Sequence, residues 1–235
     1  MDIQTQAQIY LADQRGRSQL DTLQSFHSFN FGAYSDDSRR PFGALQLLND
    51  DFLKAGASIG LEVERNTDIL LIPLVGGLEY QSPVGNGFVE PGQAQLISLR
   101  AGMAYQVMNP YETELINCVT IWLTNDSDNF VPKAELRAFN LETKNQLLPF
   151  YQSNADMSAP CGWIGRYDGR QEGLYRLTEK ARAEQGVFVF VLSGAFEVQN
   201  RLLHERDGLA LLNIQYDEVD FEALSNEAVL ILLTV

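Results

Sequence analysis

An internal repeat constrains the fold of this sequence more than any other feature. The blocks at 73–80, 92–96, 104–107 and 119–123 match those at 191–198, 208–212, 220–223 and 229–233. The offset between matching blocks drifts only from 118 to 110 residues, about half of the 235-residue chain. Within the third block, Tyr105 matches Phe221. The repeat therefore predicts two similar units in one chain.

Short strands separated by turn signals fill the sequence from about residue 57 onward. The apolar run 69–75 ends at Gly76-Gly77, and turn clusters follow at 82–87 and 91–92. Such spacing is typical of β-sandwiches and barrels. A sheet with one apolar face must cover that face, and closing the sheet into a barrel also removes its exposed edges. We therefore predict an all-β fold with one barrel in each half.

The boundary between the barrels is predicted from a polar stretch in the middle of the chain. Residues 133–148 are more polar and less regularly patterned than the strand-like segments on either side. We therefore expect a first barrel over 1–130, a connecting segment over 131–150 and a second barrel over 151–235.

Charge and hydropathy narrow the choice of partners and compartment. The chain has 31 acidic and 17 basic residues, a formal net charge of −14. A surface field of that sign repels phosphate backbones and anionic lipid, so we expect no nucleic-acid or membrane partner. The sequence opens without a charged-then-apolar leader, and its apolar runs are too short to cross a bilayer. We expect a cytoplasmic protein.

Two segments of the first half resemble the opening of the pirin family of bicupins. Residues 26–31 read Phe-His-Ser-Phe-Asn-Phe, where that family has Trp/Phe-His-x-Phe-x-Phe, and residues 48–51 read Leu-Asn-Asp-Asp, as the family does. Gly85-Asn86 and Asn109-Pro110 also fall where the family places them. The resemblance covers essentially the whole chain, most closely over 16–125. It implies two cupin barrels, which are jelly-roll-like double-stranded β-helices.

The resemblance also implies a metal site, and this sequence departs from it. In the family the first barrel usually holds iron or another divalent metal through three histidines and one glutamate. Some bacterial members are quercetin 2,3-dioxygenases, and others are regulators that bind protein partners. The four ligand positions fall here on Glu62, Glu64, Tyr105 and Val107, and the acidic residue that follows in the motif matches Asp68. We therefore expect no metal ligands and no cofactor.

The histidine content supports that expectation. The chain has only two histidines, His27 and His204, so a site with three histidines is impossible by count. Non-haem iron chemistry with oxygen normally rests on imidazoles plus a carboxylate. His27 precedes the ligand pattern and His204 lies in a polar turn, so we expect each to be hydrogen-bonded or solvated.

The vacated positions are the candidate site. Glu62 and Glu64 lie at i and i+2 of a strand and share a face, so we expect them to line one pocket of the first barrel with Tyr105 and Val107. Three environments for the glutamates stay open. The glutamates could bind a hard cation such as Mg2+, Ca2+ or Mn2+. They could instead be neutralised by Arg65, Arg100 or a ligand amine, because burying an unpaired carboxylate is costly. In the third environment, both glutamates face solvent.

The sequence thus favours a bicupin that has lost the family's metal site. Such a protein would bind a small molecule in its first barrel, or a protein partner, without dioxygenase activity. The alternative is a metal-dependent, quercetin 2,3-dioxygenase-like oxidoreductase that uses a non-standard site of glutamates and tyrosine. A dimerising scaffold with a vestigial pocket is a third reading, so the sequence alone leaves enzymatic activity open.

Overall fold

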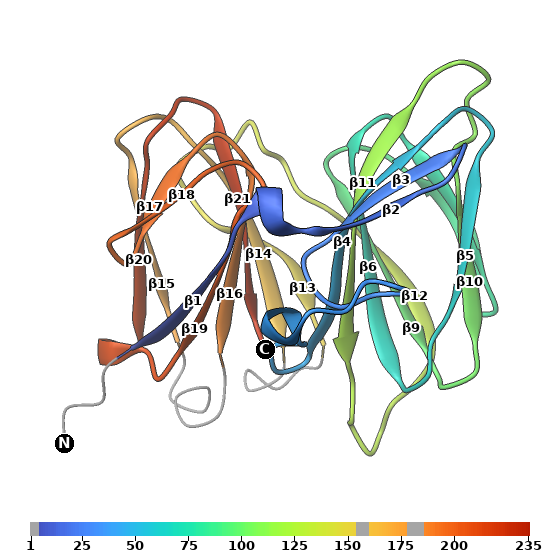
Figure 1. The fold of residues 1–235 in the computed structure, drawn as a ribbon, viewed down its shortest axis with the longest axis horizontal. Helices are drawn as coiled ribbons and strands as arrows, with labels where there is room; N and C mark the ends of the chain where they lie inside the picture. Colours follow the sequence, from blue (N-terminus) through green and yellow to red (C-terminus); the bar gives the residue numbers. More distant parts are fainter. Residues whose placement is uncertain (1–4, 154–159, 178–185) are drawn as a thin grey trace. The chain divides into compact units, whose positions relative to one another are not determined.

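The computed structural model describes residues 5–153, 160–177 and 186–235, which form strands and three short 3-10 helices. None of the helices in these ranges is long and apolar enough to cross a membrane. The chain divides into two compact units, one comprising Arg15–Phe139 and the other comprising Met1–Gln14 with Asn140–Val235. Figure 1 labels most of the strands of each unit.

The first unit is a barrel of two antiparallel sheets. The larger sheet has the order β12-β9-β6-β11-β4-β3-β2, and the smaller has the order β5-β10-β7-β8. Its strands are β2 (Gly16–Gln19), β3 (Leu23–His27), β4 (Leu45–Leu53), β5 (Ser58–Glu62), β6 (Thr67–Val75), β7 (Leu78–Ser82), β8 (Gly85–Val89), β9 (Gln93–Leu99), β10 (Ala104–Met108), β11 (Ile116–Thr124) and β12 (Lys133–Ala138).

The second unit repeats this plan. Its larger sheet has the order β1-β19-β16-β21-β14-β13, and its smaller sheet has the order β15-β20-β17-β18. Its strands are β1 (Gln6–Tyr10), β13 (Leu148–Gln152), β14 (Cys161–Tyr167), β15 (Glu172–Arg176), β16 (Val187–Ser193), β17 (Phe196–Val198), β18 (Arg201–Leu203), β19 (Gly208–Leu212), β20 (Glu218–Ala223) and β21 (Ala228–Thr234).

The strand orders of the two barrels correspond one to one, apart from the additional edge strand β2. Gly76 follows β6 with a φ of 69°, and Gly194 follows β16 with a φ of 76°. Glycine adopts this left-handed conformation without the steric cost that a Cβ brings. The two glycines therefore make equivalent turns, and the all-β fold with two cupin barrels, predicted from the repeat and the family resemblance, is confirmed.

Strand pairing corrects one residue match within the repeat. Tyr80 pairs with Val107 across β7 and β10, whereas Val198 pairs with Phe221 across β17 and β20. Tyr80 and Val198 are equivalent in the repeat, so Val107 rather than Tyr105 is the counterpart of Phe221. The sequence match missed this because the connection between the strands differs in length between the barrels.

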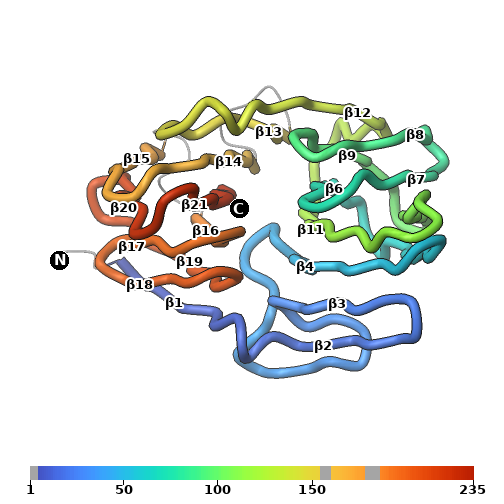
Figure 2. Tube along the Cα trace, turned by 90° about the horizontal axis from the view of Figure 1, so that it is seen from above, coloured from blue at the N-terminus to red at the C-terminus, as the bar shows by residue number. Residues whose placement is uncertain are grey.

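The division of the chain differs from the predicted one at its start and its middle. Residues 1–130 were assigned to the first barrel, but β1 pairs with β19 of the second, from Gln6 opposite Leu212 to Tyr10 opposite Gly208 (Figure 2). The predicted connecting segment 131–150 contains β12, which pairs with β9 in the first barrel. β1 and β12 thus occupy the same edge of equivalent sheets. Each of them pairs with the backbone groups of a strand that would otherwise form the edge of its sheet.

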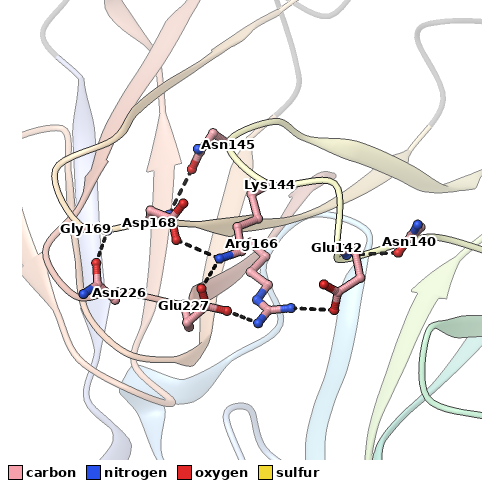
Figure 3. A network of polar contacts seen from close by, with 9 residues as sticks. All are labelled: Asn140, Glu142, Lys144, Asn145, Arg166, Asp168, Gly169, Asn226 and Glu227. Carbon is pink, nitrogen blue, oxygen red and sulfur yellow. Dashed lines mark hydrogen bonds and ion pairs between the residues drawn. The ribbon is translucent and has the colours of Figure 1, made fainter.

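An ionic network fixes the chain after β12 to the second barrel (Figure 3). The Lys144 ammonium pairs with Asp168 at 2.9 Å and with Glu227. Arg166 pairs with the same Glu227 and with Glu142 at 3.1 Å. Residues 142–144 therefore belong with the second barrel, and the boundary between the units at residues 139 and 140 lies inside the predicted connecting segment.

Candidate functional site

The four predicted site residues fall into two groups, one exposed and one buried. In β5, Ile59 and Leu61 face the core, whereas Glu62 is exposed. Tyr105 lies opposite Leu61 and Val107 lies opposite Ile59 across the β5–β10 pair. Residues directly opposite each other share a face of the sheet. Tyr105 and Val107 are accordingly 3% and 2% exposed, inside the core of the first barrel.

The glutamates lie on the other side. Glu62 is opposite Ala104, one residue out of phase with the inward pair, and Glu64 follows in the bend after the strand. Both are exposed. The expectation that all four residues line one pocket is therefore corrected, because a one-residue difference in phase moves a side chain to the opposite face.

Exposure to solvent is the environment that the structure gives to both glutamates. Within the described residues, neither Glu62 nor Glu64 forms an ion pair with Arg65 or Arg100. Arg100 instead donates to the carbonyl oxygen of Phe130 at 3.3 Å. The two carboxylates therefore keep their hydrogen-bonding capacity for solvent or for a ligand.

A pocket of about 360 Å3 opens beside the two glutamates. Its apolar wall is formed by Phe31, Pro41, Leu47, Leu61 and Trp122. Its polar lining is formed by Asn30, Gln46, Glu62, Glu64, Arg65 and Thr67. This volume lies in the range of cavities that hold small molecules, which is about 300 to 1,000 Å3. The glutamates and an apolar surface thus meet at one place on the first barrel.

Tyr105 supports this pocket from behind. Its hydroxyl oxygen accepts a hydrogen bond of 2.9 Å from the indole Nε1 of Trp122. The two rings pack edge to face with centroids 6.2 Å apart. Burial raises the pKa of the Tyr105 phenol well above its usual value, so the hydroxyl stays neutral. Tyr105 therefore positions Trp122 and does not face the pocket opening.

A buried polar network, which the sequence did not predict, lies on β3, β4 and β11. The carboxyl group of Asp51 accepts hydrogen bonds from Ser25 at 2.5 Å and from Thr120 at 2.8 Å. Burial raises the pKa of Asp51 to about 6, although both hydroxyl donors lower it and the charge of Asp50 adds to the increase. Asp50 itself pairs with Arg15 at 3.3 Å. Asp50 and Asp51, the Asp-Asp pair of the family motif, thus form an ion pair and hydrogen bonds within the first barrel.

His27 belongs to the same network. Its Nδ1 lies 2.9 Å from Oδ1 of Asn49, which is an acceptor, so Nδ1 carries the proton and Nε2 accepts from the Ser18 hydroxyl at 2.8 Å. Burial lowers the pKa of His27, which favours this neutral form. His204, by contrast, has a side chain that is 68% exposed. The prediction that each histidine is hydrogen-bonded or solvated is confirmed.

Two further motif residues also serve the fold. Asp68 accepts hydrogen bonds from Ser98 at 2.5 Å and from Asn125 at 2.9 Å. Asn109 donates to the carbonyl oxygens of Leu53 and Glu114 at 3.0 and 2.8 Å. Throughout the described part of the chain, no group of three or more His, Cys, Asp or Glu side chains is arranged to hold a metal.

Comparisons with known proteins agree with this architecture. Residues 167–233 match the family model of the quercetinase C-terminal cupin domain. The quercetin 2,3-dioxygenase of Escherichia coli (strain K12) is 29% identical over 219 residues, which cover 88% of this chain and 91% of that protein. The chain is thus similar in sequence to a bacterial quercetin 2,3-dioxygenase over most of its length.

Solved structures show the same fold over nearly the whole length. The crystal structure of YhhW from Escherichia coli matches with a TM-score of 0.83 at 22% identity, covering 98% of this chain and 97% of that one. A structure of the bacterial pirin YhhW in complex with nickel(II), also from Escherichia coli, matches with a TM-score of 0.83 at 21% identity, covering 98% and 99%. The resemblance to pirin-type bicupins is therefore confirmed.

Proposed function

We propose that this pirin-like protein is a binding protein that has lost the family's metal site and the dioxygenase chemistry that depends on it. One observation carries the proposal. At the positions where the family resemblance places the metal ligands, Glu62 at the end of β5 and Glu64 in the bend after it are exposed, whereas Tyr105 and Val107 of β10 are buried in the core.

The chemistry of these side chains supports the same conclusion. Val107 offers no donor atom, and the Tyr105 hydroxyl is buried against Trp122. Only the carboxylates of Glu62 and Glu64 remain, and oxygen ligands of this kind suit Mg2+, Ca2+ or Mn2+ better than an oxygen-activating iron centre. The residues at the site do not fit the imidazole-rich metal centre that the family resemblance implies.

A small molecule in the first barrel's pocket is the ligand that the geometry favours. The pocket has the volume, the apolar wall and the few polar groups that small-molecule sites typically combine. The net charge of −14 argues against nucleic acid and anionic membranes as partners. We propose a cytoplasmic setting, and a protein partner is the second class of ligand for this fold.

Metal content and flavonol turnover test the proposal. The purified protein is incubated with Fe2+, Mn2+, Ni2+, Cu2+ or Co2+, desalted, and analysed for bound metal and for cleavage of quercetin. The quercetin 2,3-dioxygenase of Escherichia coli serves as the positive control. We expect no retained stoichiometric metal and no turnover. The opposite result would be a protein that retains metal and cleaves quercetin, with an activity that a chelator abolishes and that Glu62→Gln reduces. That result would instead establish the alternative, an oxidoreductase with a glutamate metal site.

A further inference from the structure

We propose that the pocket beside Glu62 and Glu64 binds a small organic cation, whose charged group meets the two carboxylates and whose flat apolar body packs against Phe31 and Trp122. This inference rests on the proposed binding function and names the ligand class of the same pocket. It is drawn from the pocket's volume, its aromatic wall and the sign of its charge.

The aromatic wall is held in place by contacts behind it. Phe31 and Trp122 pack edge to face, with centroids 6.5 Å apart and an interplanar angle of 86°. Phe31 also packs on the His27 ring at 5.0 Å, and Tyr105 holds the Trp122 indole. Both aromatic residues are only partly buried. Rings fixed in this way offer a preformed surface, which lowers the entropy cost of binding a flat ligand.

The hydrogen bond to Tyr105 also decides what this wall offers. The only donor of an indole is its N–H group, and that of Trp122 is already directed at the Tyr105 hydroxyl. Trp122 therefore contributes carbon atoms of its ring to the pocket lining, and its N–H is already engaged. The face of an aromatic ring carries negative potential and attracts cations within about 6 Å, most strongly for tryptophan.

The charges at the pocket favour the same class of ligand. The ionisable residues that line it are Glu62, Glu64 and Arg65, which give two negative charges and one positive charge. Ionised carboxylates accept hydrogen bonds and donate none, which suits an ammonium or amidinium group. The net charge of −14 raises the local concentration of cations around the protein. An anionic ligand with the same apolar body meets two like charges and is disfavoured.

Three probes that share one aromatic body test the inference. Phenethylamine is cationic, phenylethanol is neutral and phenylacetate is anionic. Binding is measured by calorimetry and by the fluorescence of Trp122 in a Trp163→Phe background, because the chain has only two tryptophans. We expect phenethylamine to bind about tenfold more tightly than either other probe, and to weaken as salt is added.

Substitutions of Glu62 and Glu64 test whether their carboxylates cause the pocket's preference for a cationic probe. In the double variant Glu62→Gln/Glu64→Gln, phenethylamine should lose about tenfold in affinity, while phenylethanol should change little. Glu112→Gln, an exposed carboxylate outside the pocket lining, is the matched control and should change neither. The fluorescence response of Trp122 should persist in all variants that bind, which separates lost charge from lost folding.

Other results overturn the inference. Equal affinity for the three probes, a preference for phenylacetate through Arg65, or the absence of any response at several millimolar probe would each contradict a cation site. These outcomes concern the binding of organic probes and not metal-dependent turnover. They therefore do not contradict the proposed loss of dioxygenase chemistry. Chelator-sensitive quercetin cleavage refutes that proposed function separately.

Discussion

The two barrels place different residues at equivalent positions of the same strand order. In the first barrel Thr120 lies opposite Leu71, and Asp51 lies opposite Cys118. Matching β6 with β16 through the repeat makes Leu232 the counterpart of Thr120 and Gly165 the counterpart of Asp51. The second barrel thus has an apolar side chain and a glycine where the first has a hydroxyl and a carboxyl.

In the second barrel, aromatic rings fill the space beside two glycines. A Cβ on Gly165 would overlap the ring of Tyr167, and a Cβ on Gly173 would overlap the ring of Phe221. Tyr167 and Phe221 pack edge to face with centroids 5.2 Å apart. In the first barrel, the strand positions of Gly173 and Phe221 are held by Ile59 and Val107.

The comparison shows how two barrels with the same strand order can have different interiors. A large residue next to a glycine fills about the same volume as two medium-sized residues, and cores tolerate exchanges that keep total volume. In the second barrel, aromatic rings next to glycines occupy the interior. The first barrel instead keeps the Asp51 carboxyl and the Thr120 hydroxyl buried at these positions, and it carries the pocket beside Glu62 and Glu64 in which we expect the ligand.

The largest expected effect comes from removing the buried carboxyl of Asp51, whose position in the second barrel is held by Gly165. Burial raises the pKa of Asp51 to about 6, so the folded state binds its proton more tightly than the unfolded state does. The contribution of Asp51 to stability is therefore full below about pH 4 and is lost as the pH rises to about 6. A shift of about two units corresponds to roughly 3 kcal/mol.

Asp51→Asn should abolish this decline between about pH 4 and pH 6. The measurement is urea unfolding across that range, followed by Trp122 fluorescence in a Trp163→Phe background. Burial lowers the pKa of His27, so the contribution of His27 to stability rises with pH over part of the same range. The quantity compared is therefore the difference in unfolding free energy between Asp51→Asn and the parent at each pH. Parallel stability curves for the two proteins would show that Asp51 does not titrate in this window.

A second prediction exchanges the core residues of the two barrels. Gly173→Ile forces a side chain against the Phe221 ring and should destabilise the second barrel by about 2 kcal/mol. Adding Phe221→Val recreates the isoleucine and valine pair of the first barrel and should recover most of that loss. Unfolding is followed by Trp163 fluorescence in a Trp122→Phe background.

The control for this exchange is Gly60→Ile in β5 of the first barrel, where the nearest atom to an added Cβ is 3.8 Å away, and it is followed by Trp122 fluorescence in a Trp163→Phe background. It should change stability little, because the residue is exposed. If the two substitutions in the second barrel are additive, the idea that their volumes compensate each other is wrong.

The smallest expected effect concerns the ionic network of the second barrel, which fixes the chain after β12. Arg166→Ala removes the contacts of the guanidinium to Glu142 and Glu227, and should lower the stability of the second barrel by about 1 kcal/mol or less. High salt should reduce the difference. Arg176→Ala breaks the isolated, more exposed pair with Glu218 and should have no measurable effect. Equal losses in the two variants would show that the network adds nothing beyond single pairs.

The sequence predicted the fold more completely than the site. The glycine turns at Gly76 and Gly194 and the motif at 48–51 are local patterns, and they were sufficient for two cupin barrels. The face on which Glu62 lies depends on its pairing with Ala104, some forty residues away, and a one-residue difference in phase reverses it. The network around Asp51 draws residues from three strands, so no single segment reveals it.

The pairing of β1 with β19 sets an order of events during synthesis. The backbone N–H of Ala12 donates to the Asp207 carboxylate across a sequence separation of 195 residues. At typical translation rates, roughly 10 to 40 seconds pass between the synthesis of these two residues. The first barrel is continuous from Arg15 to Phe139 and can fold on the ribosome in that interval, whereas the second cannot be completed until β19 emerges. Until then β1 has no partner, so a truncated chain that ends before β19 leaves its N-terminus as an unpaired strand, open to proteolysis or aggregation.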